Sequence, residues 1–198
     1  MHVGSGGGLP DRGEVHGVVW SEGRGHRRAG VLANSGRRAR REVDYISTTG
    51  QYVEMFNRLI GPYPYEKFAL VENFWETGYG MPSFTLIGSK IIRFPFILHS
   101  SYPHEIPHNW WGNGVYVAYE EGNWCEGLTA YLADHLIKEQ RGQGRNYRRT
   151  MLQRYADYVT EAKDFPLTEF RSRHSAATQA IGYGKMLMVC HMPKRQQL

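Results

Sequence analysis

The chain has 198 residues, of which 41% are hydrophobic, enough apolar material for one sizeable domain or two small ones. Its net charge of +5 is weak evidence for a nucleic-acid partner, because residues 1–42 hold eight arginines against four acidic residues and residues 43–198 carry only +1. With only two cysteines, we expect no disulfide framework. The sequence has no apolar run of membrane-helix length and no secretory signal, so we expect a soluble protein. Its location is cytoplasmic by default, and export of a longer parent protein is left open.

Residues 1–42 differ in composition from the rest of the chain. They contain ten glycines and scattered arginines, and show neither a helical nor a strand period. Such a segment buries too little apolar surface to offset the entropy of ordering it, so we predict a disordered leader. A basic nucleic-acid-binding arm is the functional alternative, but aromatic residues are almost absent there.

The predicted elements of residues 43–198 begin with a helix that has threonine at its N-cap and ends at Gly61 and Pro62. Residues 67–74 and 83–94 read as strands, separated by the glycine-rich turn 76–82. Further helices are expected through 104–108, over about 125–138 and 146–162, and from about 181. A small sheet followed by helices predicts an α+β domain over residues 43–198, which we expect to be truncated within its last helix.

The stretch "SYPHEIPHNWWGNG" places two histidines four residues apart with a glutamate between them. On a helix, residues i and i+4 share a face, so His104 and His108 can direct two imidazoles at one metal ion. Glu105 lies about 100° around the helix, where it can accept a proton from water that the metal activates. This pattern is typical of a zinc hydrolase.

The motif needs a third ligand, because H-E-x-x-H arises by chance in roughly 3% of shuffled chains of this composition. A metzincin-like extension is excluded, since Trp111 and Gly114 stand where glycine and histidine would be required. Glu126 opens the next predicted helix and is the candidate, although an acid there could equally stabilise the helix dipole. Glu120 and Glu121 are alternatives in the preceding loop.

The segments "HEIPHNWWGN" and "NWCEGLTAYLADH" together resemble the aminopeptidase N-like gluzincins, a family of zinc peptidases. "GPYPYEKFALVE" upstream and "IGYGKMLM" downstream are similar to further family motifs, so the resemblance covers about residues 45–192. It implies a thermolysin-like catalytic domain, one Zn2+ per chain and a peptide substrate. It also implies roles: zinc ligation by His104, His108 and Glu126, general base and acid chemistry by Glu105, and oxyanion stabilisation by Tyr183.

Three departures from the family pattern bear on function. The interval between His108 and Glu126 is one residue shorter than usual, and Pro107 removes a backbone donor inside the motif helix. In the substrate-binding segment "GYGMPSF", Pro82 replaces the glutamate that would hold a peptide's free amine. Ser83 replaces the neighbouring asparagine.

The predicted substrate-binding residues are Gly80, Met81, Pro82 and Ser83, with Glu72 and Glu76 as candidates for a substitute amine anchor. We therefore expect zinc-dependent peptide hydrolysis with weak selection for a free N-terminus. The alternatives are a truncated homologue that binds zinc or peptide without turnover, and hydrolysis of a non-peptide substrate. The sequence predicts no nucleic-acid partner and no membrane segment, and leaves the oligomeric state open.

Overall fold

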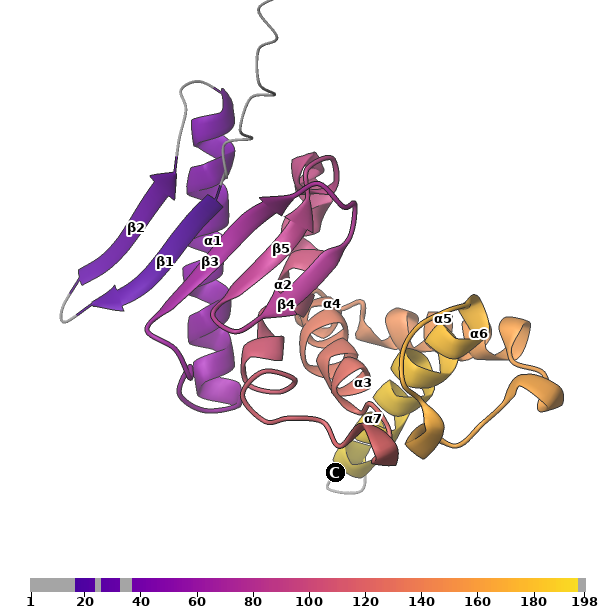
Figure 1. Ribbon diagram of the computed structural model, residues 1–198. Coiled ribbons are helices and arrows are strands. Elements are labelled where there is room, and N and C mark those ends of the chain that lie inside the picture. The colour runs from indigo at the N-terminus through magenta and orange to yellow at the C-terminus, as the bar shows by residue number, and fades with distance from the viewer. Residues whose placement is uncertain (1–16, 24–25, 33–36, 196–198) are drawn as a thin grey trace, which may run out of the picture.

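The computed structural model describes residues 17–23, 26–32 and 37–195, with side chains described from residue 44 to residue 193 (Figure 1). Within these residues the fold is a mixed α+β arrangement of one five-stranded sheet and helices. The strands are β1 (Gly17–Gly23), β2 (His26–Leu32), β3 (Lys67–Asn73), β4 (Gly78–Met81) and β5 (Phe84–Gly88). The α-helices are α1 (Arg37–Leu59), α2 (Ser101–Glu105), α3 (Cys125–Thr129), α4 (Leu136–Gln140), α5 (Gly144–Tyr158), α6 (Ala176–Gln179) and α7 (Met186–Arg195).

The sheet has the strand order β2-β1-β3-β5-β4. Strands β3 and β5 are parallel, and the other neighbouring pairs are antiparallel. Strand β4 pairs with β5 from Gly78↔Ile87 to Met81↔Phe84 and forms one edge of the sheet. Its outer backbone groups therefore face away from the sheet, toward the helices that follow in the sequence.

The prediction of a disordered leader over residues 1–42 is wrong where the structure describes that segment. Residues 17–23 and 26–32 form an antiparallel pair, and β1 also pairs with β3 from Gly17↔Val71 to Ser21↔Lys67. Composition hid these strands, because the main-chain hydrogen bonds that join β2 to β1 and β1 to β3 do not depend on side-chain identity. Residues 1–16 lie outside the described residues, and the predicted boundary at 42 falls inside α1.

Helix α1 begins before the predicted threonine N-cap. Thr49 lies inside it, and its hydroxyl donates to the carbonyl of Tyr45 one turn earlier while also bonding to the Tyr102 hydroxyl. The helix ends as expected: Ile60 still donates to the Phe56 carbonyl, and Gly61 adopts a φ of 135° that favours glycine.

Two further boundaries differ from the prediction. Residues 78–81 of the expected glycine-rich turn form strand β4. Strand β5 ends at Gly88, and the expected strand over 83–94 continues as a short 3-10 helix, Ile91–Arg93. The first error arises because the glycines of β4, which weaken a strand in sequence, are required here by the close contacts described below.

The hydrophobic core lies between one face of the sheet and the helices α1 and α2 (Figure 1). Phe56 of α1, Phe68 of β3 and Tyr102 of α2 are fully buried in it. Trp110 joins this core edge-on to Phe56, and its indole N–H donates to the carbonyl of Gly61 at 2.9 Å. The segment that carries the two motif histidines is thus held to the end of α1.

The remaining helices form a second layer beside the edge of the sheet (Figure 1). Residues 125–140 make one continuous helix, in which a π-helical segment, Ala130–His135, joins α3 to α4. A second π-helical segment, Ala180–Lys185, joins α6 to α7, and Ser175 starts α6 with a capping box some residues before the predicted start near 181. None of the described helices is both long and apolar enough to cross a membrane.

Candidate metal centre

The two motif histidines are carried by α2 and the 3-10 turn that follows it. The predicted single helix changes type at Pro107, which has no N–H: α2 ends at Glu105, and a 3-10 helix, Pro107–Asn109, continues it. Ile106 between them keeps helical dihedrals, φ −69° and ψ −47°. His104 and His108 therefore still project to one side, with ring centroids 5.3 Å apart.

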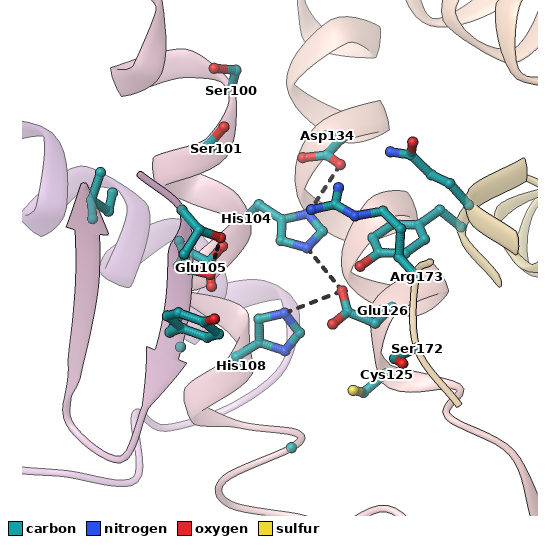
Figure 2. A pocket seen from close by; sticks show the side chains of 18 of the residues that line it. Ser100, Ser101, His104, Glu105, His108, Cys125, Glu126, Asp134, Ser172 and Arg173 are labelled. Atoms are coloured by element: carbon teal, nitrogen blue, oxygen red, sulfur yellow. Dashed lines mark hydrogen bonds and ion pairs between the residues drawn. The ribbon is translucent and has the colours of Figure 1, made fainter. Parts of the chain in front are cut away.

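Glu126, in the first turn of α3, faces both histidines (Figure 2). Its Oε2 lies 3.3 Å from Nε2 of His104 and 3.7 Å from Nε2 of His108. The three side chains each offer one ligand atom, and these atoms all lie within 4.8 Å of one another. Among the described residues this is the group that could hold a metal ion, and neither Glu120 nor Glu121, both exposed in the preceding loop, belongs to it.

The residues after the motif fix the distance between the two ligand-bearing segments. The indole N–H of Trp111 donates to Oγ1 of Thr129 at 2.7 Å, which ties the motif segment to α3. The side-chain amide of Asn113 donates to the carbonyls of His108 at 2.9 Å and of Gly80 at 3.2 Å. The contact between Trp111 and Thr129 thus helps to hold Glu126 at the distance from the histidines that the structure shows.

Asp134 is a member of the site that the sequence analysis missed. Its Oδ2 lies 3.1 Å from Nδ1 of His104, so the ring is held between Asp134 on one nitrogen and Glu126 on the other (Figure 2). A carboxylate on the remote nitrogen of a ligating histidine fixes the tautomer and orients the ring.

The π-helical segment explains why the position of Asp134 could not be predicted. Asp134 follows Glu126 by eight residues, and on an ideal α-helix that spacing rotates a side chain about 80° off the face of the first residue. A π-helical turn accommodates about one extra residue, which brings Asp134 back toward the side of Glu126. The only sequence signal was a second carboxylate on the same helix.

Glu105 is buried beside the histidines and against strand β4. A Cβ atom added to Gly78 would lie 2.6 Å from Oε1 of Glu105, and one added to Gly80 would lie 2.7 Å from Cβ of His108. The two glycines of β4 are therefore what allows the strand to approach α2 so closely. Burial raises the pKa of Glu105 to about 7, with the charge of His104 opposing the shift and that of Glu126 adding to it.

The three candidate ligands shift one another's pKa values. Burial alone would raise the pKa of Glu126, but the His104 hydrogen bond and the charges of both imidazoles lower it to about 2. Burial would lower the pKa of His104, but Asp134 and Glu126 outweigh it and raise that pKa well above the ordinary value. Burial, assisted by His104, lowers the pKa of His108 to about 4. His108 thus offers a neutral nitrogen, whereas a cation that binds here must displace the proton on His104.

Tyr183 lies on the second π-helical segment and reaches the same cluster. Its hydroxyl lies close enough to the carboxylate of Glu126 for each group to shift the pKa of the other, and its ring stacks on the His104 imidazole with centroids 6.1 Å apart. Burial first, and then Glu126, raise the pKa of Tyr183, so its hydroxyl keeps its proton as a hydrogen-bond donor.

The cluster opens into a cleft of about 950 Å3 between β4 and the C-terminal helices. Of the four predicted substrate-binding residues, Gly80 lines this cleft, whereas Met81, Pro82 and Ser83 follow it in the chain and are not among the described residues of the lining. Ser83 instead contacts the motif segment: its backbone N–H donates to Oδ1 of Asn109 at 2.8 Å. It adopts a φ of 67°.

Glu76 and Glu72, the two candidates for a substitute amine anchor, both bind other groups of the protein. The carboxylate of Glu76 accepts hydrogen bonds from the backbone amides of Lys90, at 3.0 Å, and Ile91, at 3.2 Å. Glu72 is 3.4 Å from the guanidinium of Arg93. Each carboxylate therefore has a structural partner in the fold.

Comparison of the chain with protein-family profiles, curated proteins and solved structures found no match in any of the three.

Proposed function

We propose that this protein is a zinc-dependent peptide hydrolase related to the aminopeptidase N-like gluzincins, with a thermolysin-like catalytic domain. The observation that carries the proposal is the convergence of His104, His108 and Glu126 to within 4.8 Å, with the buried Glu105 carboxyl beside them. Two imidazole nitrogens and one carboxylate oxygen form the ligand set of catalytic zinc sites, which keep one coordination position open for water or substrate.

The surroundings of the three ligands support zinc rather than a chance cluster. Asp134 on Nδ1 of His104 leaves Nε2 of that ring, the atom that faces Glu126, as the ligating nitrogen. The depressed pKa values of His108 and Glu126 keep both in the form that a metal binds at neutral pH.

When bound, zinc would supply Lewis acidity that polarises a carbonyl and makes water acidic near neutral pH. The protein's own groups would perform the proton transfers. Glu105, with its pKa near 7, would accept the proton of the attacking water and deliver it to the departing peptide nitrogen. Tyr183 would turn its hydroxyl from Glu126 to the oxygen that becomes negative during the attack.

Strand β4 offers a way to hold an extended peptide. It is an edge strand, it lines the cleft through Gly78, Tyr79 and Gly80, and Glu105 lies directly against it. A peptide that adds to this edge through main-chain hydrogen bonds would place a scissile bond near Glu105. Because Glu72 and Glu76 have other partners, we propose that a free N-terminal amine contributes little to binding.

The proposal is tested by measuring zinc content and peptide turnover in the unaltered protein and in two glutamate-to-glutamine variants. Glu105→Gln keeps the shape of the side chain but cannot accept a proton, so it should retain one zinc per chain and lose hydrolysis. Glu121→Gln alters an exposed glutamate outside the cluster and should leave both properties unchanged. Zinc binding without turnover in the unaltered protein would instead identify a non-catalytic zinc-binding or peptide-binding homologue. Normal turnover in Glu105→Gln would refute the proposed mechanism.

A further inference from the structure

A cationic side chain enters the cleft next to the candidate metal centre. Arg173 follows the short turn Leu167–Glu169, and its guanidinium carbon lies 5.8 Å from the centre of the Tyr183 ring. Figure 2 shows its side chain extending from the loop into the cleft on the side of His104. Since the Tyr183 ring is itself stacked on His104, the guanidinium lies close to where a bound peptide would react.

Three of the four described acidic side chains that line the cleft have other partners, and the fourth, Glu105, is buried against β4. Glu126 faces the two imidazoles, Asp134 faces His104, and Glu76 accepts backbone hydrogen bonds. Among the residues whose side chains the structure describes, no carboxylate lies within ion-pair distance of Arg173. Arg173 pairs with none of these carboxylates, so its guanidinium donors are presented to the cleft.

The backbone on both sides of Arg173 is fixed. On the preceding side, Asn123 donates from its backbone amide to the carbonyl of Phe170 at 2.7 Å and from its side chain to the carbonyl of Arg171 at 3.0 Å. On the following side, Oγ1 of Thr178 accepts a hydrogen bond of 2.9 Å from the amide directly after Arg173. The backbone that carries Arg173 is therefore fixed, so that little backbone entropy is lost when a ligand binds to the guanidinium.

The other charges in the cleft also favour an anionic ligand. Lys138, four residues after Asp134, is a second cation in the lining, and it too has no ion-pair partner among the described side chains. A bound divalent metal would add further positive charge. An arginine guanidinium stays protonated and presents a planar fork of donors that matches a carboxylate.

We propose that Arg173 binds a carboxylate of the substrate, so that the enzyme prefers peptides with a carboxylate near the scissile bond. The carboxylate can be that of an aspartate or glutamate side chain or that of the peptide's C-terminus. This inference rests on the proposed peptide hydrolysis and names the substrate class for that site. Arg173 acts here as a specificity determinant, whereas a purely structural contact with Tyr183 would affect every substrate alike.

The experiment compares peptides that differ only in a carboxylate. One arm pairs glutamate with glutamine at each position within two residues of the cleaved bond, and the other pairs a free C-terminus with an amidated one. The unaltered enzyme should favour the carboxylate member in one arm by about tenfold in kcat/KM, mainly through KM, as expected for one charge-assisted hydrogen-bonded pair. The arm that shows the preference identifies the source of the carboxylate.

Three variants assign the preference to Arg173. Arg173→Gln should abolish it, Arg173→Lys should retain part of it because the charge stays and the fork is lost, and Arg149→Gln, an exposed arginine of α5 outside the cleft, should leave it intact. An equal fall in kcat/KM for both members of every pair in Arg173→Gln would overturn the proposal and indicate a structural or catalytic role. So would the absence of any carboxylate preference in the unaltered enzyme.

A binding measurement separates this inference from the proposed function. In zinc-loaded Glu105→Gln, which should not turn substrate over, the carboxylate peptide should bind about tenfold more tightly than its neutral partner, and the added change Arg173→Gln should remove the difference. If the unaltered protein hydrolyses no peptide but this difference is present, the proposed hydrolysis fails and the carboxylate site stands. Equal binding of both peptides would refute the site, whatever the turnover.

Discussion

The carboxylate of Asp134 lies 3.1 Å from Nδ1 of His104, while Nε2 of the same ring faces Glu126 at 3.3 Å. One imidazole is therefore held from both nitrogens by two carboxylates of the same helix. This arrangement depends on the π-helical segment that carries Asp134, and it orients the His104 ring for the proposed zinc ligation.

Removing the charge of Asp134 should weaken zinc binding. We expect Asp134→Asn to lower zinc affinity by roughly tenfold and Asp134→Ala by up to about a hundredfold, because asparagine can still orient the ring and alanine cannot. Competition with a chromophoric chelator measures both. Asp157→Asn alters an exposed aspartate that bonds only locally to Gln153, and it is the matched control. Unchanged affinity in Asp134→Ala would remove this residue from the site.

Zinc should stabilise the fold through the proposed ligands. At a free zinc concentration about a hundred times the dissociation constant, binding adds about 2.7 kcal/mol to the free energy of unfolding, or a rise in Tm of about 5–10 °C for a chain of this size. Thermal unfolding with and without a chelator shows the shift.

The shift also tests the choice of third ligand. Glu126→Ala should lose most of it, and Glu121→Ala should keep it, because Glu121 lies outside the ligand cluster. The reverse pattern would reassign the third ligand to the loop that precedes α3.

The close approach of β4 to the motif predicts opposite effects of two glycine-to-alanine substitutions. Gly80→Ala places a Cβ atom 2.7 Å from that of His108 and 3.2 Å from the Glu105 carbonyl, so we expect a loss of about 1–3 kcal/mol in the free energy of unfolding. At Gly184 the nearest atoms are 3.7 Å away, which is ordinary contact, and alanine is the better helix former. Gly184→Ala should therefore be neutral or stabilising in denaturant unfolding. A tolerated Gly80→Ala would show that β4 can move away from the site.

Substrates with free and acetylated N-termini should be cleaved with similar specificity constants. Glu76 caps backbone amides and Glu72 pairs with Arg93, so neither carboxylate is placed to hold an ammonium group. We expect a ratio well below a hundredfold, the value that about 2.7 kcal/mol of selective binding would give. A larger ratio that Glu76→Ala abolishes would show that Glu76 leaves its structural partners to bind substrate.

The pairing of the two motif histidines could be predicted because it depends on a short-range rule. Four residues separate His104 from His108, and helical dihedrals preserve that relation even where Pro107 changes the helix type. Glu126 could be proposed because an acid opening the next helix is a local feature. Its distance from the histidines depends on long-range contacts such as the one between Trp111 and Thr129, which no spacing in the sequence reveals.

The features that were missed depend on tertiary contacts that override local preference. Strand β4 reads as a turn because its glycines serve the approach to Glu105 and His108. Strands β1 and β2 lie in a segment whose composition indicates disorder, and the pairing of β2 with β1 and of β1 with β3 is a main-chain property. The position of Asp134 depends on a π-helical segment, whereas the sequence analysis assumed the period of an α-helix throughout.

A zinc titration of turnover tests the central claim most directly. Metal-free protein is titrated with zinc while hydrolysis of an internally quenched peptide is followed. We predict that activity rises in proportion to the zinc added and saturates at one equivalent per chain. Activity that is independent of zinc, that saturates at another stoichiometry, or that is absent at every ratio while zinc still binds would contradict the account of His104, His108 and Glu126 as a hydrolytic zinc site.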